Sequence, residues 1–248
     1  MRAMILAAGL GTRLRPLTDE GPKALVEING RSLLEIALTR LRSFGTNDVI
    51  LNVHHFADKV IDYLQAKHSF GMNIAVSREE ILLDTGGGLK KAAWFFLQDN
   101  HDEPFVVHNV DVLSSIDLER MVEAHFARKA LVTLAVQGRD TSRHLLFDEN
   151  LQLCKREVEP KRDGAANSSA FSQLLPLGFC GIHVISPRIF ALMPEEGVFS
   201  IIPTYLRLAA QGERLLGFRA DEYYWRDLGT QESLEKAARD LRENILLV

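Results

Sequence analysis

The stretch Leu6-Ala-Ala-Gly-Leu-Gly-Thr-Arg-Leu-Arg-Pro-Leu-Thr18, followed by Pro22-Lys23, decides the fold of this chain. It directly follows an apolar run at residues 3–7, which predicts a buried first strand. Glycines at a strand exit permit close backbone approach and let successive amides point at an anion, while Arg13 and Lys23 supply positive charge. We therefore predict a loop that binds a polyphosphate. The alternative, a glycine-rich turn with solvated arginines, accounts poorly for so long a pattern.

Two familiar phosphate-binding motifs do not match this stretch. A dinucleotide-binding fingerprint requires a third glycine at the position of Leu14, and a P-loop requires Gly-Lys followed by Ser or Thr. A nicotinamide-dependent oxidoreductase is therefore disfavoured, and the loop predicts a nucleoside triphosphate site of another kind.

Outward from the loop, short apolar runs alternate with amphipathic stretches, as in an α/β fold with a parallel sheet and crossover helices. Further strands are predicted at residues 49–53, 74–77, 105–107 and 131–136, and helices at residues 32–44 and 57–67. After Gly138 the sequence predicts a hairpin from residues 145–147 and 151–153, a surface loop at residues 155–173 and a strand at residues 177–184. Helices are predicted near residues 187–192 and 200–211, and a last one after Thr230, whose hydroxyl can cap it.

A second motif, Val106-Val-His-Asn-Val-Asp111, is an apolar strand that ends in polar residues and an acid. Ligands of parallel sheets bind at the carboxyl ends of the strands, so Asp111 is predicted to face the same crevice as Gly11. A carboxylate there could hold Mg²⁺ against phosphate oxygens. The alternative is an aspartate that caps the next turn, and the motif alone leaves both open.

A third motif, Tyr224-Trp-Arg-Asp-Leu-Gly-Thr230, places Asp227 between aromatic residues and a helix. Asp227 could cap that helix, but Thr230 serves this purpose better. A second carboxylate that meets Asp111 would complete a Mg²⁺ site, because this ion commonly takes one or two carboxylates together with substrate phosphates.

A fourth motif, Leu83-Asp-Thr-Gly-Gly-Gly88, is predicted to open a helix that runs through residues 90–97. Glycines before a helix expose backbone amides and carbonyls, which could hydrogen-bond the edge of a nucleobase without side chains in the way. A flexible glycine loop is the alternative.

Composition narrows the class of protein further. The 248 residues include 29 Lys and Arg against 33 Asp and Glu, a net charge of −4, with 46% hydrophobic and 25% charged residues. This is an ordinary globular composition without a basic footprint for nucleic acid. The two cysteines, Cys154 and Cys180, lack disulfide or zinc spacing, which fits a reducing, cytoplasmic location. No segment reaches the roughly 18 apolar residues of a membrane span, so we expect no membrane partner.

Taken together, these motifs resemble those of the sugar-nucleotide pyrophosphorylases, the sugar-1-phosphate nucleotidyltransferases, over nearly the whole chain. The first stretch is similar to the family pattern at every position usually required. The resemblance implies a Rossmann-like fold with a mixed, mainly parallel sheet flanked by helices and a small antiparallel sugar-binding portion. It implies one catalytic domain with a nucleotide-binding part at residues 1–140, a sugar-binding and metal-completing part at residues 141–229 and a C-terminal helix at residues 230–248.

The activity implied by this resemblance is transfer of a nucleoside monophosphate from a nucleoside triphosphate to a sugar 1-phosphate, with release of pyrophosphate. Arg13 would neutralise the pyrophosphate, Lys23 would contact the α-phosphate region, and Asp111 and Asp227 would bind the cofactor Mg²⁺. The remaining nucleotide contacts implied are Leu6, Ala7, Ala8, Gly9, Gly11, Thr12, Thr85, Gly86, Gly87 and Asn109. Within the family, the chain resembles short bacterial members that act on mannose 1-phosphate or N-acetylmuramate 1-phosphate.

The sequence departs from the family pattern around the sugar. Val110 stands where many members have glycine, and the usual Glu-Lys-Pro motif is altered. The residues implied for the sugar are Glu157, Glu159, Lys161 and Gly178. Two alternative functions stay open: a non-catalytic nucleotide-sugar sensor or regulatory subunit, and nucleotidyl transfer to a non-sugar acceptor such as phosphocholine. A homodimer that uses apolar residues of the segment 200–208 is also open.

Overall fold

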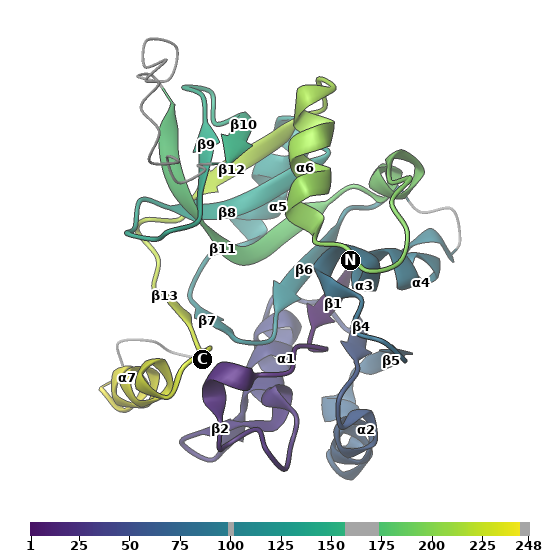
Figure 1. The fold of residues 1–248 in the computed structure, drawn as a ribbon, viewed down its shortest axis with the longest axis vertical. Coiled ribbons are helices and arrows are strands. Elements are labelled where there is room, and N and C mark those ends of the chain that lie inside the picture. Colours follow the sequence, from purple (N-terminus) through teal and green to yellow (C-terminus); the bar gives the residue numbers. More distant parts are fainter. Residues whose placement is uncertain (99–101, 157–173, 244–248) are drawn as a thin grey trace, which may run out of the picture.

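A computed structural model describes residues 1–98, 102–156 and 174–243, and its centre is a nine-stranded sheet (Figure 1). The strands follow the order β10-β9-β11-β6-β1-β4-β5, and β8 joins β12 to the other edge of β11. Their bounds are β1 Arg2–Leu6, β4 Asp48–Val53, β5 Asn73–Arg78, β6 Phe105–Asn109, β8 Val132–Gln137, β9 His144–Phe147, β10 Leu153–Arg156, β11 Leu175–Ile185 and β12 Leu215–Arg219.

The first half of the sheet is parallel and buried on both faces. Strand β1 pairs in parallel with β4 and β6, and β4 pairs in parallel with β5. Because successive side chains of a strand point to opposite faces, Ala3 and Ile5 enter one core cluster and Met4 the other. Burial on both faces explains why these strands read as unbroken apolar runs in the sequence.

Strand β11 joins the parallel half to the antiparallel half. Along one edge, Ile182 pairs with His108 of β6, whereas Gly178 pairs with His144 of β9. Between these two levels the strand bulges, and Gly181 takes a φ of +72°. A β-carbon at Gly181 would lie 2.8 Å from the side-chain nitrogen of Asn109, so only glycine lets Asn109 approach here.

Helices cover both faces of the sheet. The helices are α1 Leu33–Ser43, α2 Ala57–Ala66, α3 Asp84–Lys91, α4 Ala93–Leu97, α5 Leu118–Ala127, α6 Ile201–Ala210 and α7 Gln231–Arg242. Apolar side chains of α1, α2, α5 and α7 enter the first core cluster, and those of α3, α4 and α6 the second. Three helix starts are capped as their sequences favour, because the side chains of Ser32, Asp117 and Thr230 accept hydrogen bonds from backbone amides of the first turn.

Two small ladders lie beside the main sheet. Strand β7, Val112–Ser114, pairs with β13, Trp225–Asp227, and β2, Glu27–Ile28, pairs with β3, Arg31–Ser32. Helix α7 follows β13 and lies against the N-terminal segment in Figure 1, where the Asn29 side-chain amide donates to the carbonyl oxygen of Ala238. Helix α7 thus packs beside the turn between β2 and β3.

The predicted α/β fold with a mixed sheet is confirmed, and the predicted strands and helices lie within a few residues of the observed ones. Three details are wrong. The glycines at residues 86–88 lie inside α3 rather than before it, a break at Ala92 separates α3 from α4, and the loop predicted at residues 155–173 begins later because Lys155 and Arg156 belong to β10. The rest of that loop, up to residue 173, lies outside the described residues.

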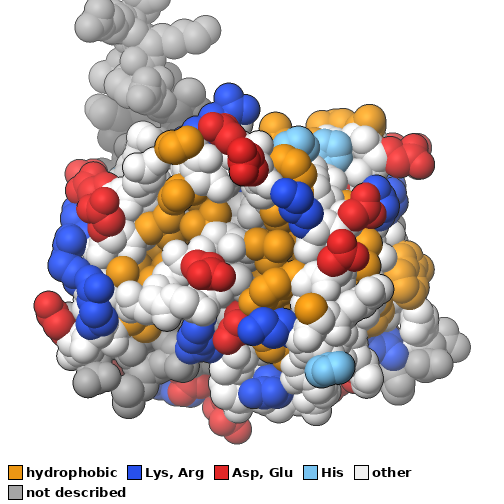
Figure 2. Space-filling model, turned by 90° about the horizontal axis from the view of Figure 1, so that it is seen from below, with side chains coloured by type: hydrophobic (Ala, Val, Ile, Leu, Met, Phe, Trp, Pro, Cys, Tyr) orange, Lys and Arg blue, Asp and Glu red, His pale blue; other side chains and the backbone are white. Residues whose placement is uncertain are grey.

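The surface mixes charges of both signs. Figure 2 shows acidic and basic side chains interspersed around apolar strips on the lower face of the molecule. On α6, the apolar residues Ile201, Tyr205 and Leu208, part of the segment expected at an interface, are buried within this chain's own core. Within residues 1–98, 102–156 and 174–243, no helix is both long and apolar enough to cross a bilayer.

Three histidines buried in the core predict a loss of stability in mild acid. Burial lowers the pKa of His108 and His125 to about 4 and the pKa of His183 to about 3. An unfolded histidine has a pKa of about 6.5, so between about pH 6.5 and 4 the unfolded chain binds protons that the folded chain does not. The free energy of unfolding should therefore fall as the pH decreases through this window, which urea denaturation at pH 7 and pH 5 measures.

A variant of a buried histidine and a variant of an exposed one test whether the buried histidines cause this pH dependence of stability. The slope of unfolding free energy against pH should become smaller in His125→Gln and stay unchanged in His68→Gln, whose side chain is exposed. Equal stability of the wild-type protein at pH 7 and pH 5 would contradict the prediction.

Candidate active site

The loop after β1 is shaped around Gly11. This residue has a φ of +65°, and its carbonyl oxygen accepts a hydrogen bond of 2.9 Å from the Thr18 hydroxyl. A β-carbon at Gly11 would lie 2.9 Å from Thr18 Cγ2 and 3.0 Å from Lys23 Cβ, so only glycine fits. Ala7 and Ala8 are buried, while Gly9 and Thr12 are exposed. The loop therefore exposes its backbone near Gly9 and Thr12, and the side chain of Lys23 packs beneath Gly11.

The short β7–β13 ladder joins the second and third motifs. Asp227 is the register partner of Val112, and the amide of Leu228 donates to the carbonyl oxygen of Asp111 at 2.8 Å. Asp111, in the turn directly before β7, and Asp227, the last residue of β13, are more than a hundred residues apart in the sequence and thus lie close together just beyond the carboxyl end of β6.

Both aspartates pair with cations of the first loop. Lys23 Nζ contacts Asp111 Oδ2, and these two side chains are 10% and 15% exposed. Arg13 Nη2 lies 3.9 Å from Asp227 Oδ1, and both of these side chains are largely exposed, so solvent screens this pair and it adds little stability. The structure therefore brings together the four residues predicted for catalysis and metal binding, from three separate segments.

The donor set at this point fits Mg²⁺. Within the described part of the chain, no group of three or more His, Cys, Asp or Glu side chains could hold a metal ion. Two carboxylates without a third protein ligand suit Mg²⁺, which commonly completes its coordination with waters and substrate phosphates. They do not suit a structural zinc ion, which requires four nitrogen or sulfur ligands.

A buried pair that the sequence analysis missed connects the first loop to α3. The Asn52 side chain accepts from the amide of Ala7 at 2.7 Å and donates to Glu79 Oε1 at 2.7 Å, and Glu79 Oε2 accepts from the amide of Leu83 at 2.9 Å. Asn52 and Glu79 are each 2% exposed. The sequence does contain a signal for this pair, because Asn52 interrupts an apolar strand and a buried polar side chain requires hydrogen-bond partners.

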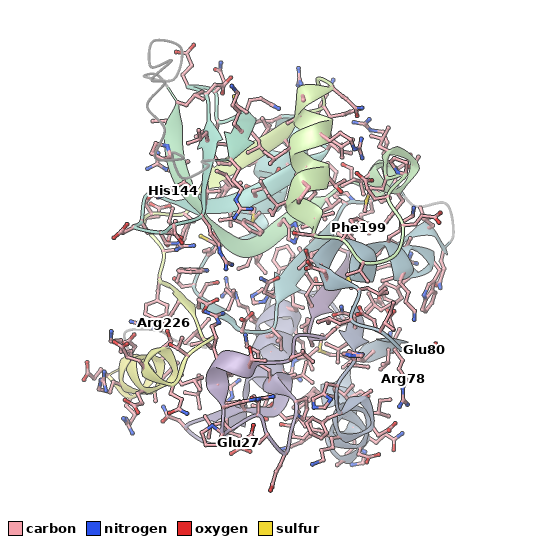
Figure 3. The ribbon with its side chains drawn as sticks, viewed as in Figure 1. Glu27, Arg78, Glu80, His144, Phe199 and Arg226 are labelled. Carbon is pink, nitrogen blue, oxygen red and sulfur yellow. The ribbon has the colours of Figure 1, made fainter. Side chains whose placement is uncertain are left out.

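The glycines of α3 pack against the segment before α6. The amides of Gly86 and Gly87 both donate to the carbonyl oxygen of Phe199, at 2.9 and 3.1 Å, and Figure 3 shows Phe199 beside the starts of α3 and α6. The idea that these glycines present free amides to a ligand is therefore wrong for Gly86 and Gly87 in this structure. Their contact with a nucleobase stays a prediction.

A cavity of about 680 Å³ opens beside these elements, a volume typical of small-molecule sites. The predicted site residues that line it are Leu6, Arg13, Thr85, Asn109 and Asp227. Another depression, of about 710 Å³ between α1 and α5, holds none of the predicted residues and lacks their phosphate-binding chemistry. The smaller cavity is therefore the candidate active site.

The wall of the cavity opposite α3 is built around Arg139. Its guanidinium carbon lies 4.1 Å from the centre of the Trp225 ring, and its Nη2 donates to the carbonyl oxygen of Phe179 at 2.8 Å. A β-carbon at Gly178 would lie 2.9 Å from that guanidinium, so the predicted sugar residue Gly178 makes room for Arg139. Among the other residues predicted for the sugar, Glu157, Glu159 and Lys161 lie outside the described residues.

The Asn52–Glu79 pair gives a specific prediction for Glu79→Gln. A glutamine offers only one acceptor oxygen, so either Asn52 or the Leu83 amide loses its partner and faces an amide group instead. Leaving one buried donor unpaired costs about 1–3 kcal/mol. We expect the free energy of unfolding to fall by this amount, measured by urea denaturation, and the KM for the nucleotide to rise because Ala7 and Leu83 are no longer held together.

The matched control is Glu80→Gln. Glu80 is the next residue along the chain, is exposed and points away from the cavity at the end of β5 (Figure 3). Glu80→Gln should leave both the free energy of unfolding and the KM for the nucleotide unchanged. Equal behaviour of the two variants would show that the buried pair does not position the loop.

Comparisons with known proteins agree with this geometry. A family model described as nucleotidyl transferase matches residues 2–145. The chain is 35% identical over 248 residues to the N-acetylmuramate alpha-1-phosphate uridylyltransferase of Caulobacter vibrioides, a match that covers 97% of each protein. It is 31% identical to the protein of the same name from Neisseria meningitidis, with 96% of each covered. A putative glucose-1-phosphate thymidylyltransferase from Bacillus anthracis shares the fold, with a TM-score of 0.80 at 20% identity over 100% of this chain and 97% of that one.

Proposed function

The chain belongs to the nucleotidyl transferase family, and on that premise we propose that it is a Mg²⁺-dependent sugar-1-phosphate nucleotidyltransferase. It would convert a nucleoside triphosphate and a sugar 1-phosphate into a nucleotide sugar and pyrophosphate. The observation that carries this proposal is the pairing of Arg13 with Asp227, both of which line the cavity, beside the contact of Lys23 with Asp111. The amide of Leu228, which donates to the carbonyl oxygen of Asp111, links the two pairs.

In the proposed reaction a phosphate oxygen of the sugar 1-phosphate attacks the α-phosphorus of the triphosphate. The new oxygen–phosphorus bond forms as the bond from the α-phosphorus to the β-phosphate oxygen breaks, and pyrophosphate leaves. The attacking phosphate is already ionised, so the step needs no general base. Among the described residues, His183 is the one histidine that lines the cavity, and burial lowers its pKa to about 3, which makes its imidazole a weak base.

The chain's own residues act by positioning and by neutralising charge, which carry most of the catalysis in phosphoryl-type transfers. Lys23 would contact the α-phosphate region, because the loop holds it beneath Gly11 and beside Asp111. Arg13 is more exposed and would neutralise the departing pyrophosphate. Asp111 and Asp227 would hold Mg²⁺, which when bound neutralises phosphate charge.

The substrates we propose to test first are UTP and N-acetylmuramate 1-phosphate. Two relatives that match this chain over nearly their whole length carry that activity in their names. Thr85 lines the cavity on the side of α3 and is our candidate for a contact with the base.

Pyrophosphate release with Mg²⁺ tests the proposal. UTP, GTP, CTP, ATP and dTTP are each paired with N-acetylmuramate 1-phosphate, mannose 1-phosphate, glucose 1-phosphate and phosphocholine. We expect one nucleotide and one sugar 1-phosphate to be clearly preferred, and no release without a divalent cation. Turnover with phosphocholine alone would show that the acceptor is not a sugar 1-phosphate. Nucleotide binding without pyrophosphate from any pair would overturn the proposal in favour of a sensor.

A further inference from the structure

The candidate active site carries more positive charge than the nucleotide accounts for. Its lining includes four arginines, Arg13, Arg139, Arg143 and Arg156, against two carboxylates among the described residues, Asp84 and Asp227. Arg13 belongs to the first loop, whereas Arg139 and Arg143 come from the segment between β8 and β9 and Arg156 ends β10. They form a basic wall, by which we mean Arg139, Arg143 and Arg156.

The basic wall lies on the far side of the cavity from α3. Figure 3 shows His144, the neighbour of Arg143, on one side of the molecule and Phe199, which contacts α3, on the other. Arg156 of β10 is the register partner of Leu145 of β9, so the two side chains face the same side of the sheet. Arg143 is two residues before Leu145 in the chain, so Arg143 and Arg156 are close to each other at this edge. Of the two carboxylates of the lining, Asp84 begins α3 and Asp227 pairs with Arg13 of the first loop.

Distance along β11 separates the basic wall from the reacting phosphates. His108, at the end of β6, pairs with Ile182, and His144, at the start of β9, pairs with Gly178. These two levels are four residues apart, at most about 13 Å along an extended strand. The residues between them on β11, Phe179, Cys180 and Gly181, line the cavity. A sugar whose phosphate lies at the end of β6 would therefore direct its far substituents toward the basic wall.

Two members of the basic wall are available to a ligand. Arg139 is fixed by Trp225 and the carbonyl oxygen of Phe179. In the described part of the chain, neither Arg143 nor Arg156 forms an ion pair or donates a side-chain hydrogen bond, and both are exposed. A guanidinium group presents paired donors that match a carboxylate.

We propose that Arg143 and Arg156 bind a carboxylate on the acceptor sugar, so that the enzyme selects acidic sugar 1-phosphates. Arg139, the third member of the basic wall, is a positioning residue that is held in place beside Arg143 and Arg156. The inference rests on the proposed function and adds to it the class of acceptor and the residues that recognise it.

The test compares two acceptors that differ by one acidic group. N-acetylmuramate 1-phosphate is N-acetylglucosamine 1-phosphate with a lactyl ether that ends in a carboxylate. With the preferred nucleotide, the wild-type enzyme should favour the acidic acceptor by roughly 10- to 100-fold in kcat/KM, as expected for charge-assisted hydrogen bonds. In Arg143→Gln and Arg156→Gln, this preference should fall by roughly tenfold each, mainly through a higher KM for the acidic acceptor.

The matched control is Arg188→Gln, because Arg188 is exposed and pairs with Glu213 away from the cavity. It should keep the wild-type preference. A wild-type enzyme that uses both acceptors equally would overturn the inference. An equal loss with both acceptors in the arginine variants would also overturn it, because those arginines would then serve the phosphate that the two acceptors share.

Failure of the proposed function is distinguishable from failure of this inference. If no acceptor yields pyrophosphate, calorimetric binding of the same two sugar phosphates in the presence of nucleotide still compares their affinities. Tighter binding of the acidic sugar, lost in Arg143→Gln, would support the inference. Equal binding of the two sugars would reject it.

Discussion

Asp227→Asn lowers turnover by about a thousandfold and leaves the fold intact, if the proposed metal site is correct. The amide keeps the shape of the side chain but removes its charge. Asp227 is 43% exposed as a side chain and its cation partner lies 3.9 Å away, so the loss of this pair costs little stability. The melting temperature should therefore stay close to the wild-type value while kcat falls.

Asp111→Asn should lower turnover as strongly but should also lower the melting temperature. Lys23 is 10% exposed and contacts Asp111, so the variant leaves a largely buried ammonium without its counter-charge. Asp58→Asn is the control, because Asp58 is an exposed carboxylate that pairs with Arg78 on the surface. Pyrophosphate release over a range of Mg²⁺ concentrations measures the effect, and full activity in either site variant would reject the metal assignment.

Gly87→Ala is expected to reverse the usual sign of a glycine-to-alanine change in a helix. Alanine normally stabilises a helix interior by about 1 kcal/mol relative to glycine. At Gly87, however, the new β-carbon would lie 2.3 Å from the carbonyl oxygen of Gly197 and 3.0 Å from Leu83 Cβ. Neither neighbour can retreat easily, because the carbonyl oxygen of Leu83 accepts from the amide of Phe199 at 3.1 Å.

The clash should therefore destabilise the protein by about 1–3 kcal/mol, as overpacking does, and should raise the KM for the nucleotide by displacing Thr85. Urea denaturation and nucleotide titration measure the two effects. Gly21→Ala is the control, since a β-carbon there has nothing within 4 Å. A Gly87→Ala protein as stable as the wild type would mean that α3 and the segment near residue 197 are not held together as described.

The fold could be predicted from the sequence where burial leaves a local pattern. Strands buried on both faces, such as β1 and β4, appear as short apolar runs, and α1 and α2 show helical spacing. The start of α3 could not be predicted, because three glycines in a row disfavour a helix. The contact with Phe199 outweighs that preference, and it lies more than a hundred residues away in the sequence.

The candidate site was predictable residue by residue but not as an arrangement. Arg13, Lys23, Asp111 and Asp227 stand in recognisable motifs, yet their meeting depends on β7 and β13, strands of three residues each that leave no periodicity to detect. The Asn52–Glu79 pair and the basic wall depend on which strands are neighbours and in which register. A sequence pattern does not contain that information, so the structure was needed to find them.

The continuity of β11 couples the unfolding of the two halves of the sheet. Because β11 hydrogen-bonds to β6 at one end and to β9 at the other, with β8 along its opposite edge, the parallel and the antiparallel half of the sheet share backbone hydrogen bonds that neither half can lose alone. The two halves should therefore melt together in one cooperative transition, and a ligand bound at either end should protect both.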